Sequence, residues 1–418
     1  MGNRSFLAAW SAFALVFFGC SSCGEKRMPA SRTEAFAENG RRSLTLIFTG
    51  DLMQHMPQVF AARQRDGSFD YTSCFSRLNN YFSSADFVIA NLETTLGEEP
   101  YSGYPRFRSP EALAGAMRRA GVDVAVLANN HICDRGAEGI RSTLAALDEA
   151  GLLHTGAFAD SVPPRERHPL MLEKGAFRVA LLNYTYGTNG LPVPSGCRVN
   201  GIDTVAIRRE IALARQDGAT HVALFVHWGN EYERLPGPRQ RELAAAFHLW
   251  GADLVFGSHP HVVQPAETIE DSAGNVRGAT VYSMGNFVSN QRFPDTDGGL
   301  SVRVTLTLDE QGRTSCRPEY LHFARPEQRL RPSLRYRAEL LARNGRARAS
   351  RRFRPVRRAY APAHGASRPR LYGDTMRLLM RRFLRIGGHG MRAAVSVSGG
   401  VEQGGAVPLW RNPLMTEC

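Results

Sequence analysis

The body of this 418-residue chain lacks paired cysteines, a long apolar run and an excess of positive charge. The seven cysteines of the whole chain include no CxxC pair outside the N-terminal region, which argues against a disulfide framework and against a structural zinc site built on thiolates. The N-terminal apolar run spans about a dozen residues, fewer than the roughly 20 that a membrane-spanning helix needs. The hydrophobic content of 43% is ordinary for a globular protein.

Positive charge is concentrated at one end of the chain. Residues 325–418 hold 21 arginines and 5 acidic residues, a net charge of +16, whereas the whole chain carries +13. The first 324 residues therefore carry −3, so we expect no nucleic-acid ligand for the body. The Arg-rich tail is interpreted either as disordered or irregular chain, or as a basic segment that contacts a polyanion or a membrane surface.

The first 20 residues have the organisation of an export signal. One arginine precedes an apolar run over residues 6–18, and a glycine and Cys20 follow it. This order is typical of a bacterial lipoprotein signal peptide, in which the cysteine is lipidated. We therefore expect Cys20 to be the lipidated residue, with Cys23 as a competitor, and residues 21–42 to form a tether at the cell envelope. The alternative is a freely secreted or periplasmic protein.

The body alternates apolar, strand-like runs with helix-like segments, which predicts an α/β domain over residues 43–324. Strands are predicted over residues 43–49, 86–90, 122–127, 177–183, 221–226 and 253–256. Helices are predicted over residues 71–83, 110–120, 137–150, 204–216 and 238–251. Residues 266–269, 280–283 and 300–308 are predicted to form antiparallel strands. Residues 188–200 are rich in Gly and Pro and predict a surface loop near the site.

Polar side chains follow these strands at the points where they end. The set comprises Asp51, Asn91, Glu93, Asn130, His131, His227, His259 and His261. Because the carboxyl ends of parallel strands lie at one edge of a sheet, these side chains are predicted to converge. Taken alone, Asp51 is equally a helix N-cap candidate. Together, oxygen and imidazole donors suit Mn, Fe, Zn or Co rather than Ca, and they are numerous enough for two ions that share a carboxylate.

Six motifs in this order resemble a known family. They are Gly-Asp at 50–51, Asn-Leu-Glu at 91–93, Asn-Asn-His at 129–131, His-Trp-Gly at 227–229, Gly-x-His-Pro-His at 257–261 and Ser-x-Gly-Asn-Phe at 283–287. The stretch that holds them is similar to the bacterial CapA family of poly-γ-glutamate capsule proteins, built on the calcineurin-like metallophosphoesterase fold. The resemblance implies a four-layer α/β sandwich of two mixed sheets flanked by helices, a dinuclear metal centre and a γ-linked glutamyl polymer as the partner.

Residue roles are implied by the same resemblance, position by position. Asp51 matches the first metal ligand, and either Glu93 or Asn91 falls at the bridging position. We favour Glu93, since a carboxylate bridges two cations better than an amide does. His131 matches the residue that protonates a leaving group. The remaining matched ligands are Asn130, His227, His259 and His261. The residues expected to contact substrate or to support the ligands are His55, Asn91, Asn129, Asp134, Trp228, Glu231 and Asn286.

Two functions are compatible with this site. The first is a metal-dependent hydrolase that uses a metal-activated water on a phosphoester or a γ-glutamyl amide, during the synthesis, export or release of an anionic capsule-type polymer. The second is a non-catalytic, anchored scaffold for polymer export, with other capsule-synthesis proteins as partners. The complete ligand set favours the hydrolase, because a scaffold needs no open coordination position.

Overall fold

The computed structural model describes residues 36–37, 41–160, 168–310, 312, 314–324 and 339–340. Cys20, the predicted signal peptide and nearly all of the predicted tail lie outside these residues. No helix within the described ranges is long and apolar enough to span a membrane. The four cysteines in these ranges are free and buried: Cys74, Cys133, Cys197 and Cys316.

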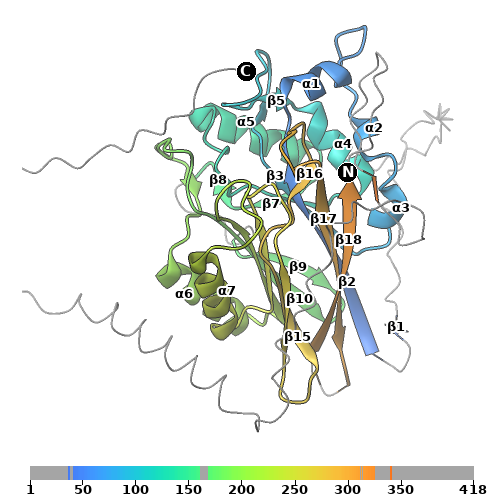
Figure 1. The fold of residues 1–418 in the computed structure, drawn as a ribbon, viewed down its shortest axis with the longest axis vertical. Helices are drawn as coiled ribbons and strands as arrows, with labels where there is room; N and C mark the ends of the chain where they lie inside the picture. The colour runs from blue at the N-terminus through green and yellow to red at the C-terminus, as the bar shows by residue number, and fades with distance from the viewer. Residues whose placement is uncertain are drawn as a thin grey trace, which may run out of the picture. The chain divides into compact units, whose positions relative to one another are not determined.

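Two mixed sheets form the centre of the described chain (Figure 1). The first sheet runs in the order β19 (Glu339–Leu340), β18 (Thr314–Ala324), β17 (Gly298–Leu308), β2 (Arg41–Leu52), β3 (Phe87–Leu92), β6 (Val124–Val126) and β7 (Leu153–Thr155), with β1 (Phe36–Ala37) and β16 (Asn286–Val288) beside β2. The second runs in the order β14 (Ala266–Glu270), β15 (Val276–Val281), β13 (Leu254–Ser258), β12 (His221–His227), β10 (Phe177–Thr185) and β9 (Leu170–Lys174).

Helices and two small strand pairs complete the described structure. The helices are α1 (Met56–Ala62), α2 (Thr72–Phe75), α3 (Asn79–Phe82), α4 (Ala112–Ala120), α5 (Gly136–Glu149), α6 (Thr204–Gln216) and α7 (Pro238–Leu249). The small pairs are β4 (Leu96–Gly97) with β5 (Ser109–Pro110), and β8 (Ala157–Phe158) with β11 (Arg198–Val199). Several helix ends follow directly from sequence: α7 begins with a proline and α4 ends at Gly121, which has a left-handed backbone.

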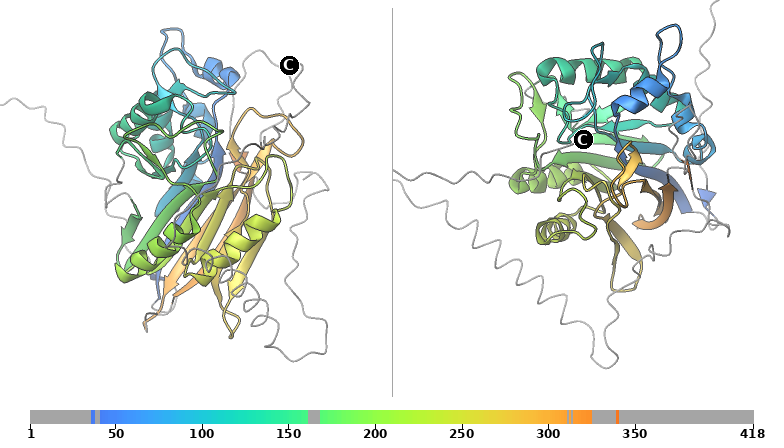
Figure 2. Two further views of the ribbon diagram at one scale, coloured as in Figure 1. Left: turned by 90° about the vertical axis from the view of Figure 1, so that its left-hand side faces the viewer. Right: turned by 45° about the horizontal axis from the view of Figure 1, so that its top comes forward.

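Three apolar layers separate four layers of secondary structure. Along β2, Ile47 packs with α4 and α5 in one cluster, while the next residue, Phe48, packs between the two sheets. Along β10, Leu181 faces the other sheet and Leu182 packs with α6 and α7. Successive strand residues point to opposite faces, so one strand supplies two cores. The helices therefore cover the outer faces of both sheets (Figure 2), and the predicted four-layer α/β sandwich is confirmed.

Two details differ from the sequence-based prediction. The single helix predicted over 71–83 is wrong: the chain forms α2 and α3, separated by a turn in which Leu78 N–H donates to the Phe75 carbonyl, 2.8 Å away. The strand predicted near 280–283 pairs antiparallel with β14 as expected, but it also pairs in parallel with β13. Both sheets combine parallel and antiparallel pairs, so the prediction of two mixed sheets is confirmed.

Candidate metal centre

The predicted site residues lie where the carboxyl ends of strands from both sheets meet. Asp51 lies inside β2 and Glu93 follows β3, both in the first sheet. His227 is the last residue of β12, and His259 follows β13, in the second sheet. Asp51, Glu93 and His227 are fully buried. The site therefore joins the two sheets at one end of the sandwich.

Asp51 links the sheets by direct hydrogen bonds. Its Oδ2 accepts from the His261 ring at Nδ1 (3.0 Å) and from the His259 backbone N–H (3.3 Å). Its Oδ1 accepts from Asn91 Nδ2 at 2.8 Å. Asn91 thus supports the carboxylate from the neighbouring strand, and its role here is that of a hydrogen-bond donor to a ligand.

Glu93 is shared by two groups of potential ligand atoms. Its Oε1 lies 3.5 Å from His227 Nε2 and 3.8 Å from His261 Nε2. The ligand atoms of Asp51, Glu93 and His261 lie within 4.8 Å of one another, and so do those of Glu93, His227 and His259. A carboxylate common to both groups is the arrangement that two cations with one bridging ligand require.

Unpaired buried atoms show that the residues fit divalent cations. Glu93 Oε1 and His259 Nδ1 are buried and have no hydrogen-bond partner in the described chain. Leaving such groups unpaired is costly, so buried polar atoms nearly always have a partner. Asn130 Oδ1 lies 2.9 Å from His227 Nε2, which adds an amide oxygen to the second group. Oxygen and imidazole donors without thiolate match first-row divalent ions.

Burial and neighbouring charges shift the pKa values of these groups in opposite directions. Burial raises the pKa of Asp51, but the hydrogen bond and charge of His261 outweigh it and the pKa falls to about 2. Burial, and then the Asp51 charge, raises the pKa of Glu93 well above its usual value. Burial lowers the pKa of His227 to about 3 and that of His259 to about 2, so both rings are neutral, the form that binds metal.

His131 lies beside the ligands and is held by a carboxylate. Its Nδ1 is 2.8 Å from Asp134 Oδ2, and the same oxygen accepts from Phe107 N–H at 2.7 Å. Asn129 Oδ1 accepts from the His131 backbone N–H at 3.1 Å. Asp134 and Asn129 therefore fix the position of His131. The Asp134 contact leaves Nε2 as the ring nitrogen available for a substrate.

The backbone at the histidine pair is strained. His259 has φ of 98° and His261 has φ of 57°, in the left-handed region that side chains other than glycine rarely adopt. Such a conformation costs of order 1–3 kcal/mol and persists where the surroundings impose it, commonly at functional sites. The turn at Pro260 thus places the His261 ring beside Asp51 and Glu93 and the His259 ring beside Glu93 and His227.

Three other predicted site residues, His55, Asn286 and Glu231, each lie in a different place relative to the ligands. The ring of His55 packs edge-on against Phe107, whose ring in turn packs edge-on against His131. Asn286 in β16 donates to Gln291 and to the Thr296 carbonyl, so it supports a neighbouring loop. Glu231 is exposed and groups with His259 and His261.

The prediction that Trp228 contacts substrate or supports the ligands is wrong, because its side chain packs in the core rather than at the site. Its ring stacks on Phe247 of α7, and its Nε1–H donates to the Tyr282 carbonyl at 2.9 Å. His227 and Trp228 are consecutive, so the two side chains leave the end of β12 on opposite sides.

Three residues at the site were not expected from the sequence. Ser258 Oγ is 2.8 Å from His227 Nδ1, and Asn189 Oδ1 accepts from Asn130 Nδ2 at 3.1 Å. The half-exposed ring of Tyr186 packs 4.6 Å from that of His259. Ser258 immediately precedes the His-x-His motif, but Asn189 and Tyr186 come from a loop region whose contacts the sequence pattern does not encode.

The fold and the site define an α/β sandwich with a buried carboxylate and imidazole cluster suited to divalent cations. The chain belongs to the bacterial capsule synthesis protein PGA_cap family, whose model matches residues 45–291. It is 30% identical to the capsule biosynthesis protein CapA of Bacillus anthracis, over 66% of this chain and 67% of that protein. It is 26% identical to the PGA biosynthesis protein CapA of Bacillus subtilis strain 168, over 68% of this chain and 73% of that protein. The family resemblance is thereby confirmed.

Among solved structures, the chain is similar to a 5′-nucleotidase precursor from Thermus thermophilus. The TM-score is 0.39 with 14% identity, and the match covers 66% of this chain and 54% of that one.

Proposed function

We propose that this chain is a metal-dependent hydrolase that acts on an anionic γ-glutamyl polymer of the capsule type. The observation that carries the proposal is Glu93, a buried carboxylate with an unpaired oxygen between two groups of ligands. The names of the CapA relatives support the polymer as the substrate class. Catalysis, rather than support of export alone, is favoured because the site also holds His131, which has no place in either ligand group.

The proposed ligands are Asp51, Glu93 and His261 for one ion, and Glu93, Asn130, His227 and His259 for the other. Two divalent ions, when bound, supply Lewis acidity that activates water and stabilises developing negative charge. His131 then has a separate task, which is to transfer a proton from Nε2 to the leaving group. Asp134 stabilises the protonated ring through Nδ1. Glu231 and His55 stand at the edge of the site as candidate substrate contacts.

Replacing His131 by alanine is expected to lower kcat by about 100-fold to 10,000-fold, because general acid catalysis is lost. The metal content should be unchanged, since the proposed ligands remain. The measurement is cleavage of a γ-linked glutamate oligomer and of bis-p-nitrophenyl phosphate by the Mn-loaded protein. His154→Ala is a matched control, because His154 also contacts a carboxylate, Asp148, at 3.1 Å.

Each result of that experiment has a separate meaning. Full activity in the His131→Ala variant would contradict the proposed acid. Cleavage of only one of the two compounds would show whether the protein hydrolyses γ-glutamyl amides or phosphoesters. Binding of the oligomer without cleavage of either compound by the wild-type protein would favour the alternative, an anchored scaffold for polymer export.

We further propose that the protein is exported and tethered at the cell envelope through a lipid on Cys20, where other capsule-synthesis proteins are its partners. The order of the first 20 residues supports export and lipidation, and the names of the CapA relatives support partners in capsule synthesis. A Cys20→Ala variant is expected to leave the membrane fraction, whereas Cys23→Ala should remain there. Immunoblots of fractionated cells measure the distribution. Retention of the Cys20→Ala variant on membranes would contradict the assignment.

A further inference from the structure

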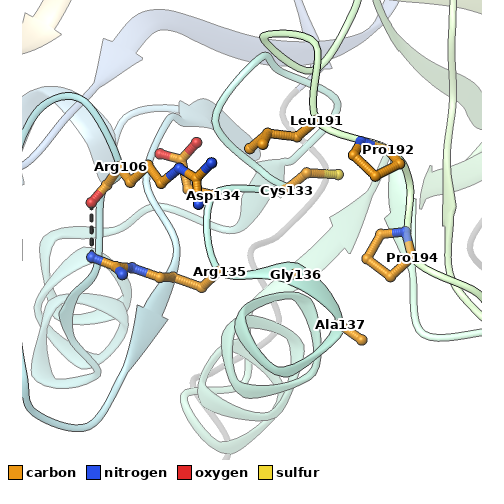
Figure 3. Close-up of a pocket in the computed structure, with 9 residues that line it drawn as sticks. All are labelled: Arg106, Cys133, Asp134, Arg135, Gly136, Ala137, Leu191, Pro192 and Pro194. Carbon is orange, nitrogen blue, oxygen red and sulfur yellow. Dashed lines mark hydrogen bonds between the residues drawn. The ribbon is translucent and has the colours of Figure 1, made fainter.

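A pocket is lined in part by Asp134, the carboxylate that contacts His131 (Figure 3). Its volume is about 460 Å³. Polar residues line one side and apolar residues the other. The polar side consists of Arg106, Asp134 and Arg135, and the apolar side consists of Leu191, Pro192 and Pro194.

The pocket shares two of its walls with the metal centre. Asp134 lines the pocket and also contacts His131 at 2.8 Å. On the other side, the loop that carries Leu191 also carries Asn189, which accepts a hydrogen bond from the proposed ligand Asn130. A chain-like substrate bound at the metals could therefore place a neighbouring unit in this pocket.

The guanidinium groups of the pocket have unused hydrogen-bonding capacity. Arg106 forms no side-chain hydrogen bond or ion pair with any residue that the structure describes. Arg135 donates to the Arg106 carbonyl at 3.0 Å and to Ser102, but its Nε is buried without a partner. The one carboxylate in the lining, Asp134, is already engaged by His131 and by Phe107 N–H. The pocket thus holds more positively charged hydrogen-bond donors than its own carboxylate can pair with.

Two further features favour an anion over a neutral ligand. Burial, followed by the nearby positive charges of Arg108 and Arg106, lowers the pKa of Arg135, and an anion would relieve that repulsion. Gly136 and Ala137, which begin α5, also line the pocket. The start of a 14-residue helix adds a partial positive charge.

We propose that this pocket binds an α-carboxylate of a γ-linked glutamyl chain, with Arg106 and Arg135 as donors; this inference rests on the proposed function. A planar carboxylate matches the fork of a guanidinium. A γ-linked chain carries one free carboxylate on every residue, separated by methylene groups. The apolar side of the pocket suits those methylene groups, so charge and shape select the same ligand.

The test compares binding of two trimers to the Mn-loaded full chain by calorimetry. One is γ-linked triglutamate, and the other is the same trimer with its α-carboxylates converted to carboxamides. Arg106→Ala is the main variant, because the fold does not use its guanidinium. It is expected to weaken triglutamate binding about tenfold or more, the loss typical of a charged hydrogen bond, and to leave the carboxamide trimer unaffected. Arg209→Ala, on the exposed face of α6, is the matched control.

Three results would overturn the proposal. They are unchanged triglutamate affinity in the Arg106→Ala variant, an equal loss for both trimers, and no binding of triglutamate to the wild-type protein. Repeating the titration after metal removal separates this inference from the proposed hydrolysis. Failure of the hydrolase proposal would appear as absence of cleavage products, whereas the dependence of affinity on Arg106 would persist.

Discussion

Replacing His261 by alanine is expected to lower the affinity for divalent metal by at least about 100-fold. Loss of a residue that only supports a ligand typically costs 10-fold to 100-fold, so loss of a ligand should cost no less. His261 contacts Asp51 directly and lies 3.8 Å from Glu93, so its removal also leaves a buried carboxylate without its main partner. Hydrolytic activity should fall with the metal content.

Elemental analysis after dialysis measures this loss, and His248→Ala is the matched control. His248 is a largely buried histidine with two structural contacts, to the Ala252 carbonyl at 2.8 Å and to Thr280 Oγ1 at 2.7 Å. Its loss should lower stability without changing the metal content. A His261→Ala variant that retains the wild-type metal content and activity would refute its role as a ligand.

Replacing Gly257 by alanine is expected to lower the free energy of unfolding by about 3 kcal/mol or more. A Cβ at this position would lie 2.0 Å from the Tyr282 carbonyl oxygen and 2.5 Å from Trp228 Nε1. Neither atom can move freely, because Trp228 donates to that same carbonyl and Gly257 O accepts from Met284 N–H. The substitution must therefore push β13 away from the chain that follows β15.

Chemical denaturation measures the change, and Gly201→Ala provides the comparison. A Cβ at Gly201 meets no heavy atom within 4 Å. Since His259 follows Gly257 by two residues, we also expect weaker metal binding in the Gly257→Ala variant. Equal stability of the two alanine variants would show that the approach of β13 to Tyr282 is not tight.

The strands and most helices were predictable because their signals are local. A short apolar run such as residues 254–256 indicates a buried strand, and a proline or glycine at a helix boundary indicates where the helix begins or ends. The convergence of the site residues followed from the strand ends alone. The contact between Asp51 and His261, which are 210 positions apart, followed only from the assumption that both strands end at the same place.

The errors arose where a local pattern allows more than one packing. Residues 71–83 place Tyr71, Phe75, Leu78 and Phe82 at helical spacing, yet a turn between α2 and α3 buries all four without a continuous helix. Alternation does not identify the partner of a strand, so the parallel pairing of β15 with β13 was not predictable.

The roles of some residues could be recognised only from contacts between distant segments of the chain. Asn183 is fully buried at the end of β10 and joins the two sheets, because its Oδ1 accepts from Leu127 N–H at 3.0 Å and Ala128 N–H at 2.6 Å. Its Nδ2 donates to the Phe225 carbonyl at 3.0 Å. A polar residue that ends an apolar strand was the available signal, but three backbone partners from two sheets could not be inferred from it.

The central claim is that one buried carboxylate, Glu93, is shared by two bound cations. Anomalous scattering from crystals grown with Mn²⁺ tests it most directly. We predict two peaks on either side of Glu93, one next to Asp51 and His261 and the other next to His227 and His259. A single peak that Glu93 does not contact, or no peak among these residues, would contradict the claim.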